Sequence, residues 1–187
     1  MEALAHNLRS NSEAVAHKTR MGFNLIEAAI VLAVVGGVIG GIWYSASAVT
    51  EKSRQKTTLE MLTLCVNKMR MALKQVPAHS YIDGDSFNNL AVSIGAIPES
   101  RKTAYGPISI AYEDNFGGRD FVLILNYLTQ SACIAVVSFF SNNATTYGLT
   151  RVIFYNPQVN YTTFPIITSS ITSGCSYTGA FTIQFNY

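Results

Sequence analysis

The sequence predicts an α+β protein in which one long N-terminal helix precedes a domain that contains β-strands. Residues 24–76 hold no proline, so one uninterrupted helix can run through them. The last third of the chain differs in character: after Asp120 its one charged residue is Arg151, and Thr, Ser, Asn, Tyr and Phe are abundant. Such a segment has enough apolar and aromatic side chains to bury in packed strands, which argues against a disordered tail.

The first half of the predicted helix is apolar on all sides, as expected of a helix in a membrane or in the core of a bundle. Between residues 23 and 50 the one charged side chain is Glu27. A run of about 20 apolar residues is long enough to cross a bilayer. The basic residues ahead of this run, Arg9, Lys18 and Arg20, predict a cytoplasmic N-terminus and an exported C-terminal part.

The second half of the helix is amphipathic. Its apolar residues recur at spacings of three and four, which predicts a stripe that lies against a globular domain. This stripe consists of Leu59, Leu62, Val66, Met69, Leu73 and Val76. The globular domain is expected to extend over residues 51–187.

Three segments in the C-terminal part have strand patterns. Residues 121–125 form a continuous apolar run, which is typical of a buried strand, and residues 151–155 are the next candidate. Between them, Thr129 can cap a short helix that contains Cys133. At the C-terminus, Phe181, Ile183, Phe185 and Tyr187 alternate with polar residues, which predicts a half-buried strand with one aromatic face.

No arrangement of residues that is typical of catalysis occurs in the sequence. Residues 23–187 contain one histidine, His79, and neither a nucleophile motif, a phosphate-binding loop nor a zinc-ligand pattern. The net charge is +2 without a basic stripe, so nucleic-acid binding is not indicated. We therefore expect no enzyme, no metal site and no cofactor.

Residues 20–27 read Arg-Met-Gly-Phe-Asn-Leu-Ile-Glu and lead directly into the apolar run. This motif in this position resembles the processing site of the type IV pilin family, and the long leader and long remaining chain are most similar to the type IVb subgroup. The resemblance implies that a prepilin peptidase cuts between Gly22 and Phe23 and that the new amino group of Phe23 is methylated. Phe23 departs from the subgroup, which more often begins with another apolar residue.

The resemblance also implies an architecture and partners. Residues 1–22 would be the leader, residues 23–50 a membrane-spanning helix that later forms the filament core, and residues 51–187 an exported domain with an antiparallel sheet against the helix. The subunit would first be embedded in the inner membrane as a single-pass protein, and would then polymerise into an extracellular pilus. Its partners would be copies of itself, the prepilin peptidase, an assembly ATPase, an inner-membrane platform protein and, with an outer membrane, a secretin.

Glu27 is the predicted assembly residue. A carboxylate at the centre of a bilayer helix costs about 2.5–3.5 kcal/mol on insertion scales, so it is rare without a role. Glu27 lies one helical turn beyond Phe23, whose amino group becomes a cation after cleavage. We expect these charges to pair between neighbouring subunits and so to set their axial stagger.

The chain has three cysteines, and an exported domain is expected to hold a disulfide bond. Cys133 and Cys175 are the predicted pair, because both lie in the charge-poor third, where pilins similarly bridge two cysteines. Cys65 lies on the apolar stripe and is expected to be a buried free thiol. A bond between Cys65 and Cys133 remains open from the sequence alone.

Other readings of the chain stay open. The apolar run can be a secretory signal cleaved at Ala46-Ser47-Ala48, although it is longer than the usual h-region, or a plain membrane anchor. The protein can also be a minor pilin, a type II secretion pseudopilin, or an anchored or secreted binding module. The sequence does not distinguish adhesion from aggregation, motility, DNA uptake or conjugation.

Overall fold

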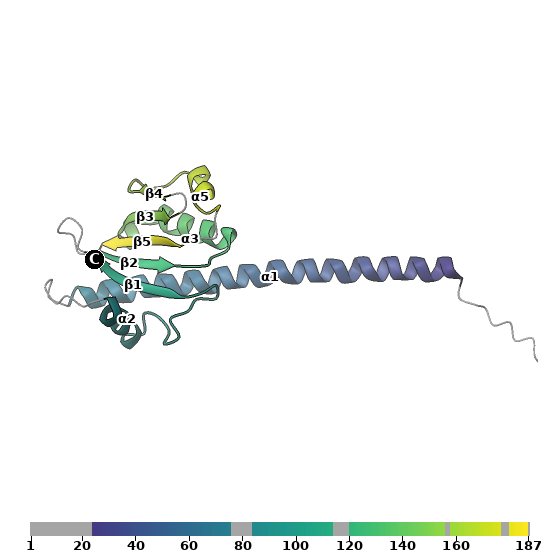
Figure 1. The fold of residues 1–187 in the computed structure, drawn as a ribbon, viewed down its shortest axis with the longest axis horizontal. Helices are drawn as coiled ribbons and strands as arrows, with labels where there is room; N and C mark the ends of the chain where they lie inside the picture. Colours follow the sequence, from purple (N-terminus) through teal and green to yellow (C-terminus); the bar gives the residue numbers. More distant parts are fainter. Residues whose placement is uncertain (1–23, 76–83, 114–119, 156–157, 177–179, 187) are drawn as a thin grey trace, which may run out of the picture. The chain divides into compact units, whose positions relative to one another are not determined.

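The computed structural model describes residues 24–75, 84–113, 120–155, 158–176 and 180–186 (Figure 1). The chain divides into two compact units, Met1–Ala48 and Val49–Tyr187, and each is considered by itself. The predicted leader and the predicted cleavage site between Gly22 and Phe23 lie outside the described residues, as do Val76 and Tyr187.

The first helix, α1 (Leu25–Leu73), is the long helix expected from the proline-free segment. Its start is capped by Asn24, whose side-chain Oδ1 accepts a hydrogen bond of 3.3 Å from the backbone N–H of Ile26. The predicted continuous helix is confirmed as far as Leu73. In the first unit its large apolar side chains are exposed.

In the second unit, α1 buries one face. The buried residues on this face are Thr58, Leu62, Cys65, Val66, Met69 and Leu73. The predicted stripe is therefore confirmed at Leu62, Val66, Met69 and Leu73, and Leu59 is half-buried at its edge. These side chains belong to the same core as the inner face of the sheet, so α1 is packed on that sheet.

The sheet has five antiparallel strands in the order β1-β2-β5-β3-β4 (Figure 1). Their bounds are β1 Ile108–Glu113, β2 Asp120–Leu125, β3 Leu149–Tyr155, β4 Gln158–Tyr161 and β5 Phe181–Asn186. The strands expected at residues 121–125 and 151–155 are confirmed as β2 and β3. The predicted α+β class, with a long helix packed on an antiparallel sheet, is confirmed.

The C-terminal strand β5 is more deeply buried than its alternating pattern predicted. The aromatic face is as expected, and Phe185 stacks on Phe121 with ring centroids 5.5 Å apart. The polar side chains of Thr182 and Gln184 on the other face are also buried. The expectation of a half-buried strand was wrong because β5 is the central strand, between β2 and β3, and side chains of these neighbours lie beside its polar residues. On the β3 side, Tyr155 OH lies 2.9 Å from Thr182 Oγ1. Gln184 Nε2 donates to Asp120 Oδ2 at 2.6 Å, which satisfies one of these buried polar groups.

The described part of the second unit also contains four shorter helices. They are α2 Gly84–Ser93, α3 Gln130–Asn142, α4 Ala144–Tyr147 and α5 Thr168–Gly174. The predicted cap of α3 is confirmed, since Thr129 Oγ1 accepts a hydrogen bond from the backbone N–H of Ala132. The apolar face of α3 enters the core through Val136, Val137 and Phe140.

Candidate functional site

Glu27 lies in the first turn of α1 and is exposed in the isolated chain. Phe23, its expected partner, lies outside the described residues. The pairing of the two charges therefore stays a prediction.

The first half of α1 presents an apolar surface on every side. Leu25 is 83% exposed, Leu32 71% and Trp43 74%, and α1 is the one helix among the described residues that is long and apolar enough to cross a membrane. A contiguous apolar surface of this size marks a site of contact with lipid or with other protein chains. Length and composition alone do not distinguish these two environments.

The carboxylate of Glu51, on α1 near the start of the second unit, accepts four hydrogen bonds from side chains. Glu51 Oε1 accepts from Thr129 Oγ1 at 2.7 Å, from Ser131 Oγ at 2.9 Å and from Tyr105 OH at 3.0 Å. Gln55 Nε2, one turn along α1, donates at 3.3 Å. The Glu51 cluster, defined by these five residues, thus connects α1 with the N-terminus of α3 and with the segment that precedes β1.

The cluster favours the ionised form of Glu51. The pKa of Glu51 lies below its ordinary value of 4.5, and the hydrogen bond from Thr129 is the largest cause. Partial desolvation acts in the opposite direction and raises the pKa. The hydrogen bonds from Ser131, Tyr105 and Gln55 lower it further. The carboxylate also lies close to the N-terminus of α3, where the helix dipole favours a negative charge. Burial, followed by the hydrogen bond to Glu51, raises the pKa of Tyr105 to about 12, so its hydroxyl remains a donor at neutral pH.

The second unit contains one disulfide bond among its described residues. It joins Cys133 on α3 to Cys175, the C-cap of α5, with an S–S distance of 2.05 Å. This is the pair expected from the sequence, and the alternative bond between Cys65 and Cys133 is not formed. Cys65 is a buried free cysteine, and burial raises the pKa of its thiol to about 12, which makes it unreactive.

The arrangement of these elements is similar to that in a solved pilin. The crystal structure of a type IVb pilin from Salmonella typhi superposes with a TM-score of 0.55, covers 71% of this chain and 98% of that chain, and shares 20% sequence identity. The chain has the type IVb pilin fold. At this identity the likeness concerns the fold, while the biological role is a separate question.

Two further solved structures are similar over comparable lengths. One is the crystal structure of TcpA, a type IV pilin from Vibrio cholerae El Tor biotype, with 14% identity, a TM-score of 0.43 and coverage of 74% of this chain and 99% of that chain. The other is the NMR structure of the type IVb pilin PilS from Salmonella typhi, with 20% identity, a TM-score of 0.41 and coverage of 74% and 94%. No family model and no curated protein matches the sequence.

Sequence reasoning missed the Glu51 cluster of this pilin fold. One signal was available: Glu51 is the first charged residue after the apolar run. Its partners could not be inferred, because Tyr105, Thr129 and Ser131 follow it by 54, 78 and 80 residues. Of the predicted site residues, the structure brings together Cys133 and Cys175, while Glu27 is described alone.

Replacing Glu51 with alanine should lower the free energy of unfolding of the second unit by about 1 kcal/mol at pH 7, a modest value because the site is partly solvated. Because the pKa of Glu51 is lowered on folding, its contribution is present above pH 4.5 and is lost as the pH falls through the folded value. Urea unfolding of the full chain in detergent at pH 7 and pH 3 measures both effects.

The matched control is Glu60→Ala. Glu60 is an exposed acid on the same helix, and its Oε1 lies 3.8 Å from Lys56 Nζ in an exposed ion pair. Surface pairs of this kind contribute little, so the control should change stability only slightly. Equal losses for Glu51→Ala and Glu60→Ala, or a Glu51→Ala loss that is unchanged at pH 3, would contradict the role given to the Glu51 cluster.

Proposed function

We propose that this protein is a structural subunit of a type IV pilus. The observation that carries the proposal is the exposed apolar half of α1 in a chain with the type IVb pilin fold. An apolar helix of this length needs either lipid or other apolar helices around it. The apolar helix of a pilin is surrounded first by lipid in the membrane and then by other apolar helices in the filament.

In this proposal the subunit begins as a single-pass protein of the inner membrane, with its N-terminus in the cytoplasm. The prepilin peptidase removes residues 1–22 by cutting between Gly22 and Phe23, and Phe23 is then N-methylated. Residues 23–50 remain as the membrane helix, and residues 51–187 form the exported domain. The sequence motif at residues 20–27 supports this processing.

Assembly transfers the apolar helix from lipid into a bundle of identical helices. Head-to-tail contacts between subunits do not close on themselves, so they generate an open filament. An assembly ATPase and an inner-membrane platform protein would drive the transfer, and a secretin would let the filament through an outer membrane where one exists. Pairing of Glu27 with the amino group of Phe23 on a neighbouring subunit would fix the axial stagger.

The processing step is tested by mass spectrometry of the mature N-terminus from cells that carry a prepilin peptidase. We expect a terminus at methylated Phe23, and we expect Gly22→Val to leave most of the protein uncut because the larger side chain obstructs the peptidase at the scissile bond. Gly41→Ala is the matched control; nothing lies within 4 Å of its added Cβ, and it should be cut normally. A mature N-terminus at Val49 would instead establish a secretory signal and overturn the proposal.

A further inference from the structure

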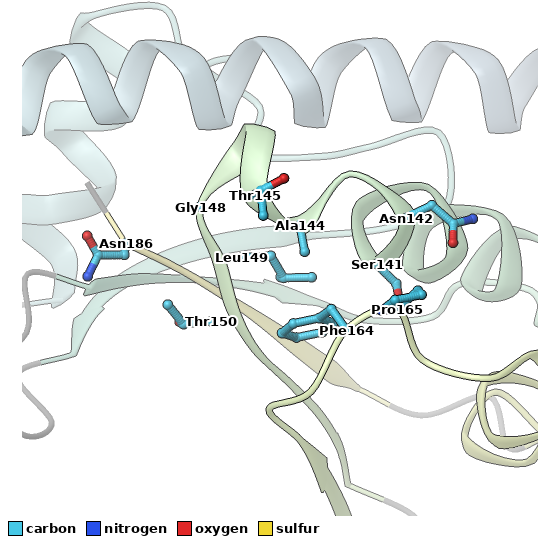
Figure 2. A pocket seen from close by; sticks show the side chains of 10 residues that line it. All are labelled: Ser141, Asn142, Ala144, Thr145, Gly148, Leu149, Thr150, Phe164, Pro165 and Asn186. Carbon is cyan, nitrogen blue, oxygen red and sulfur yellow. The ribbon is translucent and has the colours of Figure 1, made fainter.

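A surface hollow of about 590 Å³ lies in the second unit, where the end of α3, α4, the start of β3 and the segment before α5 meet (Figure 2). This volume lies in the range of small-molecule binding sites. Figure 2 shows Leu149 and Phe164 in the middle of the group of lining side chains, with Asn186 and Asn142 at its two ends. None of its lining residues belongs to the apolar half of α1 or to the Glu51 cluster, so the proposed function does not use it.

The hollow combines an apolar interior with uncharged polar groups. The half-buried Phe164 ring and the buried Leu149 supply apolar surface. Asn142, Thr145 and Asn186 are exposed, and within the part of the chain that the structure describes their side chains make no hydrogen bond. Two amides and a hydroxyl are therefore available as both donors and acceptors.

The backbone holds these groups in place. Gly148, with φ of +68°, ends α4 in the left-handed conformation that glycine adopts readily, and its carbonyl accepts a hydrogen bond of 2.7 Å from the N–H of Asn186. The segment that carries Phe164 is held by the N–H of Ile166, which donates to the buried Ser141 Oγ at 2.6 Å. A backbone that is fixed in this way loses little conformational entropy when a ligand binds.

Among the residues that the structure describes, no ionised side chain lines the hollow. Arg70 lies beside Gly148, and its Nη1 donates to the carbonyl of Thr146 at 2.9 Å. Among these lining residues an anionic ligand would therefore find no charged partner, and a purely apolar ligand would make no use of the exposed amides and the hydroxyl. A ligand that fits both parts needs neutral hydroxyl groups together with an apolar C–H surface.

We propose that this hollow binds a neutral sugar residue of a glycan. The C–H face of a pyranose ring packs on the face of Phe164, since aromatic rings offer a large, rigid apolar surface. The sugar hydroxyls exchange hydrogen bonds with the amide of Asn142 and with the hydroxyl of Thr145, which act as donors and acceptors in turn. The site gives the second unit a binding function that is independent of filament assembly.

Saturation-transfer NMR on the full, unassembled chain in detergent tests this proposal. The probes are methyl β-D-galactopyranoside, methyl α-D-mannopyranoside and methyl β-D-glucopyranoside, with N-acetylneuraminic acid as the anionic comparison. We expect transfer to the ring C–H protons of at least one neutral glycoside and none to the acid. Asn142→Ala and Thr145→Ala should each weaken binding about fivefold, as the loss of one hydrogen bond does, and Phe164→Leu should abolish the transfer.

Asn160→Ala is the matched control, because Asn160 is an exposed asparagine on β4 that does not line the hollow. It should bind like the wild type. Asn142 and Thr145 are exposed and unbonded, so their variants should keep the native circular dichroism and the intact disulfide bond. The proposal is overturned if no neutral glycoside receives saturation, if transfer persists unchanged in the hollow variants, or if the acid alone is bound. Reduced filament yield from the hollow variants without any sugar binding would assign the hollow to a contact between subunits.

Discussion

Replacing Glu27 with alanine should give a subunit that is cut after Gly22 and reaches the membrane but forms few or no filaments. Before assembly, Glu27 lies near the start of α1, where the carboxylate can stay partly hydrated at the membrane interface. In a filament core the same position would be enclosed by apolar helices. Removing one partner of a buried ion pair leaves the other charge unpaired, at a cost of about 3–5 kcal/mol for each subunit contact.

Glu27→Gln should fail in the same way, because the amide keeps the shape of the carboxylate but cannot neutralise the amine of Phe23. Pilus yield in sheared cell fractions and the mass of the processed subunit in the membrane separate assembly from processing. Glu99→Ala serves as the control, since Glu99 is an exposed acid in the second unit. A normal pilus yield from Glu27→Ala alone would show that this charge does not set the register of assembly.

Loss of the disulfide bond should destabilise the second unit by about 4 kcal/mol, the value that the chain-entropy model gives for a closed loop of roughly 40 residues. Cys133→Ser and Cys175→Ser should have similar effects, because either change opens the same loop between α3 and the end of α5. Denaturant midpoints of the full chain in detergent measure the change. A reductant should lower the midpoint of the wild type to that of the variants and leave the variants unaffected.

Cys65→Ala is the control for the disulfide variants. Cys65 is completely buried, and alanine removes one sulfur atom without introducing a polar group, so its cost should be about 1 kcal/mol. Serine is less suitable here because its hydroxyl would be buried in the apolar core. A non-reducing peptide map that links Cys65 to Cys133 or to Cys175 would contradict the prediction.

Features that depend on neighbouring residues could be predicted from the sequence. The absence of proline and the three-four spacing of Leu62, Val66 and Met69 indicated both the length of α1 and its buried face. The Thr129 cap of α3 could also be predicted, because Thr129 and Ala132, whose N–H it accepts from, are only three residues apart.

Apart from the disulfide pair, features that depend on contacts between distant segments could not be predicted. The alternation in residues 181–187 indicated a strand but not its neighbours, so the burial of Thr182 and Gln184 was missed. The hollow around Phe164 could not be predicted either, because its lining residues come from separate segments: α3, α4, β3, β5 and the segment before α5. The pattern of polar and apolar residues along a chain indicates which side chains avoid water. How deeply a side chain is buried also depends on the distant segments that pack against it.

The place of β5 in the sheet has a consequence for the order of folding. The strands made earlier form two antiparallel pairs, β1 with β2 and β3 with β4, and each pair is close in sequence. β5 joins them, and it is the last of the five strands along the sequence. A chain that stops before Phe181 holds two separate ribbons, and two-stranded ribbons are marginally stable in water. The sheet is thus completed only when Phe181–Asn186 has become available, so a product that is interrupted before these residues cannot close its core.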